Sequence, residues 1–193
     1  MNSIEEIEKY AYENDIPIMQ KVGIDFLCNF IKQNNIKRIL EIGSAIGYSA
    51  IKMVLVSSDI KIVTIERDKE RFDLAVKNID NLKLSNQINI RLEDALESQV
   101  DGEFDLIFID AAKAQYIKFF NKYSTNLSKK GFIISDNMSF HGLTENVKEI
   151  KSRNLRQLVT KINKYKDFLL NNEEFNTEFY QIGDGIAISS RKE

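Results

Sequence analysis

The chain has 193 residues, of which 43% are hydrophobic and 29% are charged, and its formal net charge is −2. This composition is ordinary for a soluble globular domain, and the slightly acidic net charge argues against a protein that coats nucleic acid. No apolar run is long enough to span a membrane and the acidic N-terminus lacks a signal-peptide pattern, so we expect one cytoplasmic domain over residues 1–193 that makes no membrane contact.

Two helical patterns open the chain and form a predicted N-terminal helical cap over residues 1–35. The first covers residues 3–13 and the second, after Pro17, covers residues 18–32. Helical spacing places a set of apolar side chains on the buried side of the second helix, namely Val22, Phe26, Leu27 and Phe30. We therefore expect this helix to pack against the domain that follows it.

Strand-like and helical patterns then alternate through the middle of the chain. Strands are predicted at residues 38–42, 61–65, 87–91, 105–109 and 131–135, with helices between them at about 46–56, 69–82 and 114–127. Strands that are joined through helices form right-handed βαβ units, and repeated units build a parallel sheet with helices on both faces. The sequence therefore predicts an α/β fold.

The C-terminal part departs from this alternation. Residues 175–182 and 186–190 are two extended segments separated by Gly183-Asp184-Gly185, which is typical of a hairpin. Together with the five parallel strands, they predict a seven-stranded, mostly parallel sheet with an antiparallel hairpin at one edge. Asp184 would reach a ligand only if this hairpin bends over the edge of the sheet.

A basic helix precedes the hairpin. Between Lys148 and Lys166 there are seven basic residues and one acid, Glu149. Apolar residues recur at helical spacing in the same stretch, so the charges are expected on the exposed side of the helix. Two interpretations stay open: a solvated helix face, or a patch that meets the phosphates of a nucleic acid.

The turn after the first predicted strand is informative about the ligand. A dinucleotide-binding turn has three glycines in the order G-x-G-x-x-G, but here the pattern is E-x-G-x-x-x-G from Glu41 to Gly47. The Glu41 carboxylate would repel a pyrophosphate, whereas it suits S-adenosylmethionine, which carries an ammonium and a sulfonium group. Glu66 ends the second strand, where an acid can accept hydrogen bonds from ribose hydroxyls. The sequence thus favours S-adenosylmethionine over NAD.

Acidic residues directly follow two of the apolar strands. Asp110 comes after strand 105–109, and Asp136-Asn137 follows strand 131–135. If these strands are parallel neighbours, their carboxyl ends lie about 5 Å apart at the edge where α/β proteins bind ligands. Two carboxylates and a carboxamide suit a hard divalent cation, which predicts magnesium, with manganese also compatible. His141 lies close by but is not expected to be a ligand, because such a site needs no imidazole.

Taken together, these motifs resemble the class I metal-dependent O-methyltransferases, the family that includes catechol and caffeoyl-CoA enzymes. Within that family the chain most resembles the bacterial tRNA 5-hydroxyuridine methyltransferases. The segments that carry the resemblance are residues 16–19, 39–49, 65–68, 109–116, 134–137 and 182–185. Glu93 departs from the pattern, because the family commonly has glycine before the Asp-Ala pair found here at 94–95. The resemblance implies a Rossmann-like methyltransferase fold and a homodimer.

The resemblance also implies which residues bind the cofactor. S-adenosylmethionine would contact Met19, Glu41, Gly43, Ser44, Gly47, Ser49, Glu66, Asp94, Ala95 and Asp110. Within this set, Glu66 would hold the ribose, and Asp94 and Ala95 would lie along the adenine. Met19 would close over the cofactor.

Metal binding and catalysis would fall to the acidic clusters and to one lysine. The implied metal ligands are Asp110, Asp136 and Asn137. Lys113 and Asp110 are the implied catalytic residues, with Lys113 acting as general base or as a partner of the oxyanion. Tyr116 suits either a site role or packing, whereas Phe119, Phe120 and Tyr123 are expected to pack in the core.

The reaction that the resemblance implies is methyl transfer to the 5-hydroxyl of wobble 5-hydroxyuridine in tRNA, giving 5-methoxyuridine. The basic helix 148–166 would then contact phosphates near the anticodon loop. Two alternatives stay open: a small-molecule catechol-type O-methyltransferase, and a non-catalytic RNA-binding module that kept the fold. An intact set of site residues speaks against the second alternative, namely Glu41, Asp110, Lys113, Asp136 and Asn137.

Overall fold

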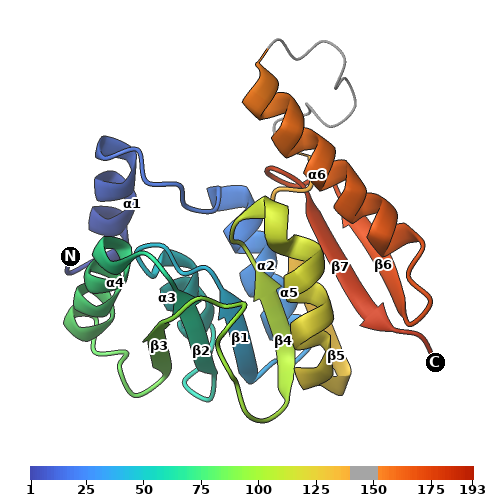
Figure 1. The fold of residues 1–193 in the computed structure, drawn as a ribbon. Coiled ribbons are helices and arrows are strands. Elements are labelled where there is room, and N and C mark those ends of the chain that lie inside the picture. Colours follow the sequence, from blue (N-terminus) through green and yellow to red (C-terminus); the bar gives the residue numbers. More distant parts are fainter. Residues whose placement is uncertain (140–151) are drawn as a thin grey trace.

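The computed structural model describes residues 1–139 and 152–193 (Figure 1). In these residues seven strands form one sheet in the order β3-β2-β1-β4-β5-β7-β6. The strands are β1 (Arg38–Ile42), β2 (Lys61–Glu66), β3 (Ile88–Leu92), β4 (Phe104–Ile109), β5 (Leu127–Ser135), β6 (Phe175–Tyr180) and β7 (Ile186–Arg191). Strands β1 to β5 are parallel, and β7 runs antiparallel to both β5 and β6. The predicted Rossmann-like sheet with an antiparallel edge hairpin is confirmed.

Helices connect and flank these strands. They are α1 (Ile4–Glu13), α2 (Lys21–Gln33), α3 (Tyr48–Val54), α4 (Lys69–Asn81), α5 (Tyr116–Tyr123) and α6 (Arg153–Leu170), with 3-10 turns η1 (Lys113–Gln115) and η2 (Ser124–Asn126) beside α5. Short polar side chains cap free backbone N–H groups at some helix starts, as where Asp68 Oδ1 accepts from the N–H of Arg71. Within the described part of the chain, no helix has the length and apolar character needed to cross a membrane.

Helix α6 contains most of the predicted basic helix. Its buried residues Val159, Ile162, Tyr165 and Leu169 recur at helical spacing. Arg153, Arg156, Lys161 and Lys164 are exposed on the helix, as the amphipathic pattern predicts. Residues 148–151 of the predicted helix, and His141, lie outside the described residues.

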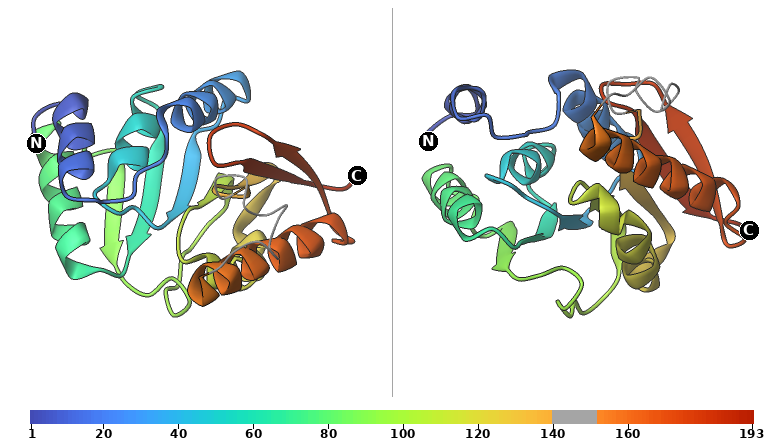
Figure 2. Two further views of the ribbon diagram at one scale, coloured as in Figure 1. Left: turned by 90° about the horizontal axis from the view of Figure 1, so that it is seen from above. Right: turned by 45° about the horizontal axis from the view of Figure 1, so that its top comes forward.

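Side chains on both faces of the sheet are buried in two hydrophobic cores. On β1, Ile39 belongs to the core beneath α1 to α4, whereas Leu40 belongs to the core beneath α5 and α6. The two neighbours face opposite cores because successive side chains of a strand point to opposite faces. Figure 2 shows α2 and α3 on one face of the sheet, with α5 and α6 on the other.

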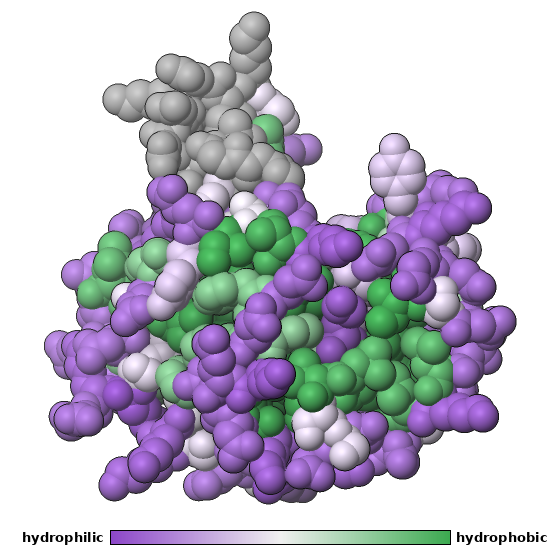
Figure 3. All heavy atoms as spheres, turned by 180° about the vertical axis from the view of Figure 1, so that it is seen from behind, coloured by the Kyte–Doolittle hydropathy of each residue, from purple (hydrophilic) through white to green (hydrophobic). Residues whose placement is uncertain are grey.

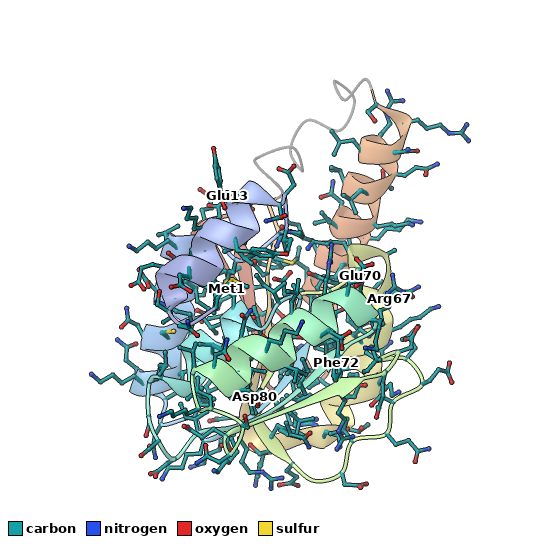
Figure 4. The ribbon with its side chains drawn as sticks, turned by 90° about the vertical axis from the view of Figure 1, so that its left-hand side faces the viewer. Met1, Glu13, Arg67, Glu70, Phe72 and Asp80 are labelled. Atoms are coloured by element: carbon teal, nitrogen blue, oxygen red, sulfur yellow. The ribbon has the colours of Figure 1, made fainter. Side chains whose placement is uncertain are left out.

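The N-terminal helix α1 is attached to the rest of the domain by polar contacts. The α-amino group of Met1 donates to Asn78 Oδ1 on α4 at 3.1 Å, and Tyr48 Oη donates to Glu8 Oε1 at 2.7 Å. Figure 4 shows α1 and α4 from the side on which these helices lie, with Met1, Glu13 and Asp80 labelled. These contacts join the predicted helical cap to the segment that carries the glycine turn.

Helix α2 differs from the prediction in where it begins and in which side of its first turn is buried. The helix begins at Lys21 rather than at residue 18, it lies against α3, and its buried residues are Gly23, Ile24, Leu27 and Ile31. The prediction that Val22 is buried is wrong, since 56% of this residue is exposed on the outer side of the first turn. Figure 3 shows apolar surface among charged side chains when the molecule is seen from behind.

Strand β5 is longer than predicted and α5 is shorter. The strand begins at Leu127 instead of residue 131, and its pairing with β4 shifts register between Phe104 and Leu106. Helix α5 ends at Tyr123, and η2 completes the connection. The sequence pattern missed this start because Lys129 and Lys130 interrupt the apolar run of the strand with exposed side chains.

The register of the parallel strands decides what lies at their carboxyl ends. Ile42 of β1 pairs with Ile109 of β4, and Ile109 pairs with Ser135 of β5. The residues that follow these three are Gly43, Asp110 and Asp136. Neighbouring strands are about 5 Å apart, so the glycine turn and both acidic clusters meet at one edge of the sheet, as predicted.

Candidate functional site

A cavity of about 640 Å³ opens at the edge of the sheet where β1, β2, β4 and β5 end. Pockets of this volume hold cofactors and other small molecules. Most of the predicted site residues line it: Met19, Gly43, Ser44, Ser49, Glu66, Asp94, Ala95, Asp110, Lys113, Asp136 and Asn137. Glu41 and Gly47 belong to the same glycine turn but are not part of the lining.

Gly43 brings the glycine turn against the end of β4. Its φ is +93°, and a Cβ built on it would lie 2.3 Å from the carbonyl oxygen of Asp110. Only glycine has both the backbone freedom and the absence of a side chain that this approach requires. The turn is closed on its other side by a hydrogen bond of 2.9 Å from Gly43 N to Ile65 O.

Glu41 lies beneath the cavity rather than in its wall. The residue is fully buried, and its carboxyl oxygens accept hydrogen bonds of 2.5 Å from Ser49 Oγ and Thr64 Oγ1. Burial raises the pKa of Glu41 from 4.5 to about 7, against the effect of these two hydrogen bonds. Ser49 does line the cavity, so Glu41 contacts the cavity only through the Ser49 hydroxyl.

Glu66 occupies the end of β2 and organises the backbone around it. One carboxylate oxygen accepts from Ala45 N at 2.9 Å, and the other accepts from Arg67 N and Asp68 N, both at 2.9 Å. The carboxylate therefore ties the glycine turn of β1 to the start of α4. Nearby, Ser44 Oγ is buried without a hydrogen-bond partner in the described residues. An unsatisfied hydroxyl in the wall of a cavity is available to a ligand.

The acidic clusters converge at the other end of the cavity. Asn137 Nδ2 donates to Asp136 Oδ2 at 2.9 Å and to Asp110 Oδ1 at 3.5 Å. Asp136 is only 4% exposed. Burial, followed by repulsion from the Asp110 carboxylate, raises the pKa of Asp136 from 3.8 to about 7. Two carboxylates thus face each other with little solvent to separate their charges.

The donor set of this cluster fits a hard divalent cation. Carboxylate and amide oxygens are the protein ligands that magnesium takes, and it fills its other positions with water or substrate oxygens. Rotation of the Asn137 side-chain amide by about 180° would exchange the positions of its oxygen and its nitrogen. The amide oxygen would then face the two carboxylates as a third oxygen ligand for a cation. The cluster has two carboxylates and one amide, and nowhere in residues 1–139 and 152–193 are three or more His, Cys, Asp or Glu side chains grouped to hold a metal.

Tyrosine side chains support this acidic end from behind. Tyr116 Oη donates to the carbonyl oxygen of Asp136 at 3.2 Å, and its ring packs edge-on against Tyr165 of α6. Tyr165 Oη lies 2.7 Å from Ser135 Oγ. Tyr116 is 2% exposed, so its role is to hold the end of β5 in place. Phe119, Phe120 and Tyr123 are buried in the same core, as predicted.

The roof of the cavity comes from two distant segments. One is the stretch before α2, with Pro17, Ile18 and Met19, and the other is the hairpin turn with Gly183 and Asp184. The two meet where Gly183 lies against the start of α2. The turn is fixed to the acidic end by hydrogen bonds from Met138 N to Gly185 O and from Ser139 N to Asp184 O, of 2.9 and 2.7 Å. The hairpin therefore does bend over the site, which is the condition that a contact by Asp184 requires.

Some lining residues were not among the predicted site residues. They include Ala45, Arg67, Arg71, Leu96, Ala111, Ala112 and Gln115. Most of them lie next to a predicted site residue in the sequence, and this adjacency is the signal from which they could have been predicted. Arg67, labelled in Figure 4, lies between Glu66 and Asp68, the residue that caps α4.

Comparison with known proteins identifies the family of the chain. The O-methyltransferase family matches residues 1–192. A catechol O-methyltransferase from Niastella koreensis is 37% identical over 123 residues, which are 58% of this chain and 55% of that protein, so the match spans about half the length of the relative. A crystal structure from Staphylococcus aureus, assigned provisionally to the caffeoyl-CoA O-methyltransferases, is 39% identical with a TM-score of 0.94 and covers 100% of this chain and 93% of that one. An O-methyltransferase from Bacillus cereus in complex with SAH has the same fold, with a TM-score of 0.84 at 23% identity over 98% of this chain and 90% of that one.

Proposed function

The chain belongs to the O-methyltransferase family and is an S-adenosylmethionine-dependent O-methyltransferase, and we propose that its acceptor is the 5-hydroxyl of wobble 5-hydroxyuridine in tRNA, which becomes 5-methoxyuridine. The observation that carries this proposal is the position of α6. The helix packs against η1, the turn that carries Lys113, and Tyr165 attaches it to the residue before Asp136. A helix with an exposed basic face thus lies next to the acidic end of the cavity.

The charges on α6 suit an RNA substrate. Arg153, Arg156, Lys161 and Lys164 are exposed there. Phosphates of an anticodon stem and loop would meet these cations, while an unstacked base of the loop enters the cavity. A small catechol has no phosphate and would leave this surface unused, which is why the basic face favours tRNA over a catechol.

The cofactor would lie along the edge of the sheet in the order of the strands. We place its methionine part at Gly43, Ser44 and Ser49, its ribose at Glu66, and its adenine beside Asp94 and Ala95. Ser49 donates its hydroxyl proton to Glu41, so its oxygen lone pairs remain free to accept from the cofactor ammonium. The Glu41 carboxyl would act from beneath the cavity on that cation.

The chemistry needs a deprotonated acceptor oxygen placed in line with the methyl group. Magnesium, or manganese, held by Asp110, Asp136 and Asn137 would favour the oxyanion form of the acceptor hydroxyl. The acceptor oxygen forms a bond to the methyl carbon as the carbon–sulfur bond of the cofactor breaks, which leaves S-adenosylhomocysteine. Lys113 lies at this end of the cavity, where it takes the hydroxyl proton or pairs as a cation with the oxyanion.

A transfer assay tests the proposal. The protein is incubated with labelled S-adenosylmethionine and bulk tRNA from cells that lack it, first with magnesium and then with chelator. Digestion to nucleosides should show metal-dependent conversion of 5-hydroxyuridine to 5-methoxyuridine. If conversion continued in the presence of chelator, the assignment of the acceptor would stand and the assignment of a metal-dependent mechanism would be wrong.

A small-molecule acceptor is the second candidate, since one relative is a catechol O-methyltransferase. Activity on a catechol with no transfer to tRNA would replace the tRNA proposal with this one and leave the site chemistry unchanged. RNA binding without any affinity for S-adenosylmethionine would instead indicate a non-catalytic module. The homodimer stays a prediction, which sedimentation equilibrium would measure.

A further inference from the structure

One wall of the cavity is built without a helix of its own. The connection from β3 to β4 covers residues 93–103, and its first four residues, 93–96, line the cavity. Backbone groups in such a segment need hydrogen-bond partners, because a buried N–H or C=O without one is costly. Only the Asp94 carbonyl of this segment accepts from the helical-type N–H groups that follow it, so the next two carbonyl groups, those of Ala95 and Leu96, depend on side chains from elsewhere.

Helix α5 supplies those side chains. Lys122 Nζ donates to Ala95 O at 3.0 Å and to Leu96 O at 2.6 Å, and Tyr123 Oη donates to Ala95 O at 2.6 Å. Both lone pairs of the Ala95 carbonyl are therefore used. Lys122 is half-buried, and its ammonium group also lies 5.2 Å from the centre of the Tyr123 ring. Such charge-assisted bonds are stronger than bonds between neutral groups.

These contacts orient the backbone of the cavity wall. Asp94 O accepts from Glu97 N and Ser98 N, at 2.9 and 2.8 Å. The opposite end of that planar peptide unit is the N–H of Ala95, which points away from the turn and has no hydrogen-bond partner among the described residues. The Asp94 carboxylate is held as well, since its Oδ1 accepts from Leu96 N at 2.8 Å. Asp94 and Ala95 both line the cavity, so a carboxylate acceptor and a backbone donor belong to neighbouring residues of its wall.

We propose that Lys122, assisted by Tyr123, is a positioning residue for the purine-binding wall of the site: it pulls the carbonyl groups of Ala95 and Leu96 toward α5 and thereby holds the Ala95 N–H and the Asp94 carboxylate in place for the adenine of the cofactor. A base with a ring-nitrogen acceptor next to an amino donor, as in adenine, matches such a pair. The inference rests on the cofactor placement given under the proposed function. Lys122 touches no ligand itself and acts through the backbone.

The test uses cofactor binding and needs no acceptor. Isothermal titration calorimetry compares the affinity of the full chain for S-adenosylhomocysteine and for its inosine analogue, which has a carbonyl oxygen in place of the adenine amino group. The variants are K122M, which keeps the length of the side chain without its charge, K122R, which keeps donors, and Y123F. The matched control is K118M, an exposed lysine of the same helix.

K122M should bind S-adenosylhomocysteine about tenfold more weakly, in line with the loss of hydrogen bonds from a charged group. It should also discriminate less between the adenine and inosine compounds, whereas K118M should behave as the unmodified chain. K122R should recover most of the affinity, and Y123F should lose less than K122M because Lys122 still binds the Ala95 carbonyl.

Two outcomes would overturn the inference, and they are distinguishable from failure of the proposed function. The first is unchanged affinity in K122M. The second is a loss of affinity for both compounds by the same factor with a lowered melting temperature, which would indicate general destabilisation. If the unmodified chain bound neither compound, the proposed placement of S-adenosylmethionine in this cavity would be wrong.

Discussion

The side-chain nitrogen of Lys113 lies 3.3 Å from Oδ1 of Asp110, three residues earlier in the chain. The two side chains are 18% and 22% exposed, and both face the cavity rather than the outer surface. Asp110 directly follows β4, which ends at Ile109, and Lys113 begins η1, so a three-residue separation joins the two side chains. The position of this lysine beside a predicted metal ligand makes it the first residue to test.

K113A should slow methyl transfer by about 10²–10⁴-fold, the range that a positioned acid or base contributes. Affinity for S-adenosylhomocysteine should stay unchanged, because Lys113 is placed at the acceptor end of the cavity. Single-turnover rates with saturating acceptor measure the effect, and K118A on the exposed side of α5 is the control. Equal single-turnover rates in K113A and the unmodified chain would remove Lys113 from the mechanism.

D136N should lower activity by at least about a hundredfold. Loss of a group that only hydrogen-bonds to a metal ligand already costs about 10–100-fold, and Asp136 is predicted to bind the metal directly. The direct readout is binding of Mn²⁺ followed by electron paramagnetic resonance, which should weaken strongly. Binding of S-adenosylhomocysteine should persist, since Asp136 lies at the end of the cavity away from Glu66. D59N, at an exposed carboxylate, is the control. Retention of full Mn²⁺ affinity by D136N would contradict the metal assignment.

G43A should destabilise the chain by about 1–3 kcal/mol or more, the cost of a strained backbone. Its Cβ would lie 2.3 Å from the carbonyl oxygen of Asp110, and its φ of +93° disfavours any side chain. Urea unfolding measures the change. G23A is the matched control, because the nearest atom there is the flexible end of Met19 at 3.1 Å and alanine is favoured inside a helix. If G43A and G23A had the same free energy of unfolding, the close approach of Gly43 to β4 would make no contribution to stability.

The buried Glu41 predicts a dependence of stability on pH. Its pKa is about 7 in the folded chain and 4.5 in the unfolded chain. As pH rises above about 4.5 the unfolded chain loses this proton first, so the folded state loses relative stability until it also releases the proton near pH 7. Glu41 should therefore lower the free energy of unfolding by about 3 kcal/mol across this range, at about 1.4 kcal/mol per pKa unit.

The E41Q side chain has no titratable proton, so the decrease in the free energy of unfolding that Glu41 causes between pH 4.5 and about 7 should be absent from this variant. Urea unfolding of both proteins at pH 5 and pH 8 measures the difference. Asp136 titrates in the same direction, but it is present in both proteins and cancels in the comparison. E13Q, at an exposed carboxylate, is the control. Identical pH dependence in E41Q and the unmodified chain would show that Glu41 is ionised normally.

Charge reversal on α6 tests the RNA contact. The double variant K161E/K164E should weaken tRNA binding and reduce the slope of affinity against salt concentration by about 0.9 per lost phosphate contact. Affinity for S-adenosylhomocysteine should not change, because these side chains are exposed on the outer face of the helix. K9E/K77E carries the same charge change on exposed residues of α1 and α4. Equal tRNA affinity in both double variants would leave α6 as a solvated face.

Sequence patterns were sufficient for the order of elements and for the convergence of the acidic clusters. Asp110 and Asp136 each follow a short apolar run, and strands of one parallel sheet end at the same edge. Their proximity therefore follows from local periodicity plus one rule of topology. The glycine turn is similar, since Gly43 and Gly47 are needed for backbone shape at positions that the chain itself defines.

Tertiary structure alone decided which side chains face the cavity and what holds them. Glu41 begins the glycine motif and Ser49 follows its end, yet Glu41 is beneath the cavity and Ser49 lines it. The hairpin turn with Asp184 covers the site, and Lys122 reaches the carbonyl of Ala95 in another connection. Such contacts join residues far apart in the chain through the packing of whole helices and strands. No local period in the sequence encodes them, because their distances depend on how the layers pack and on which backbone groups remain to be satisfied.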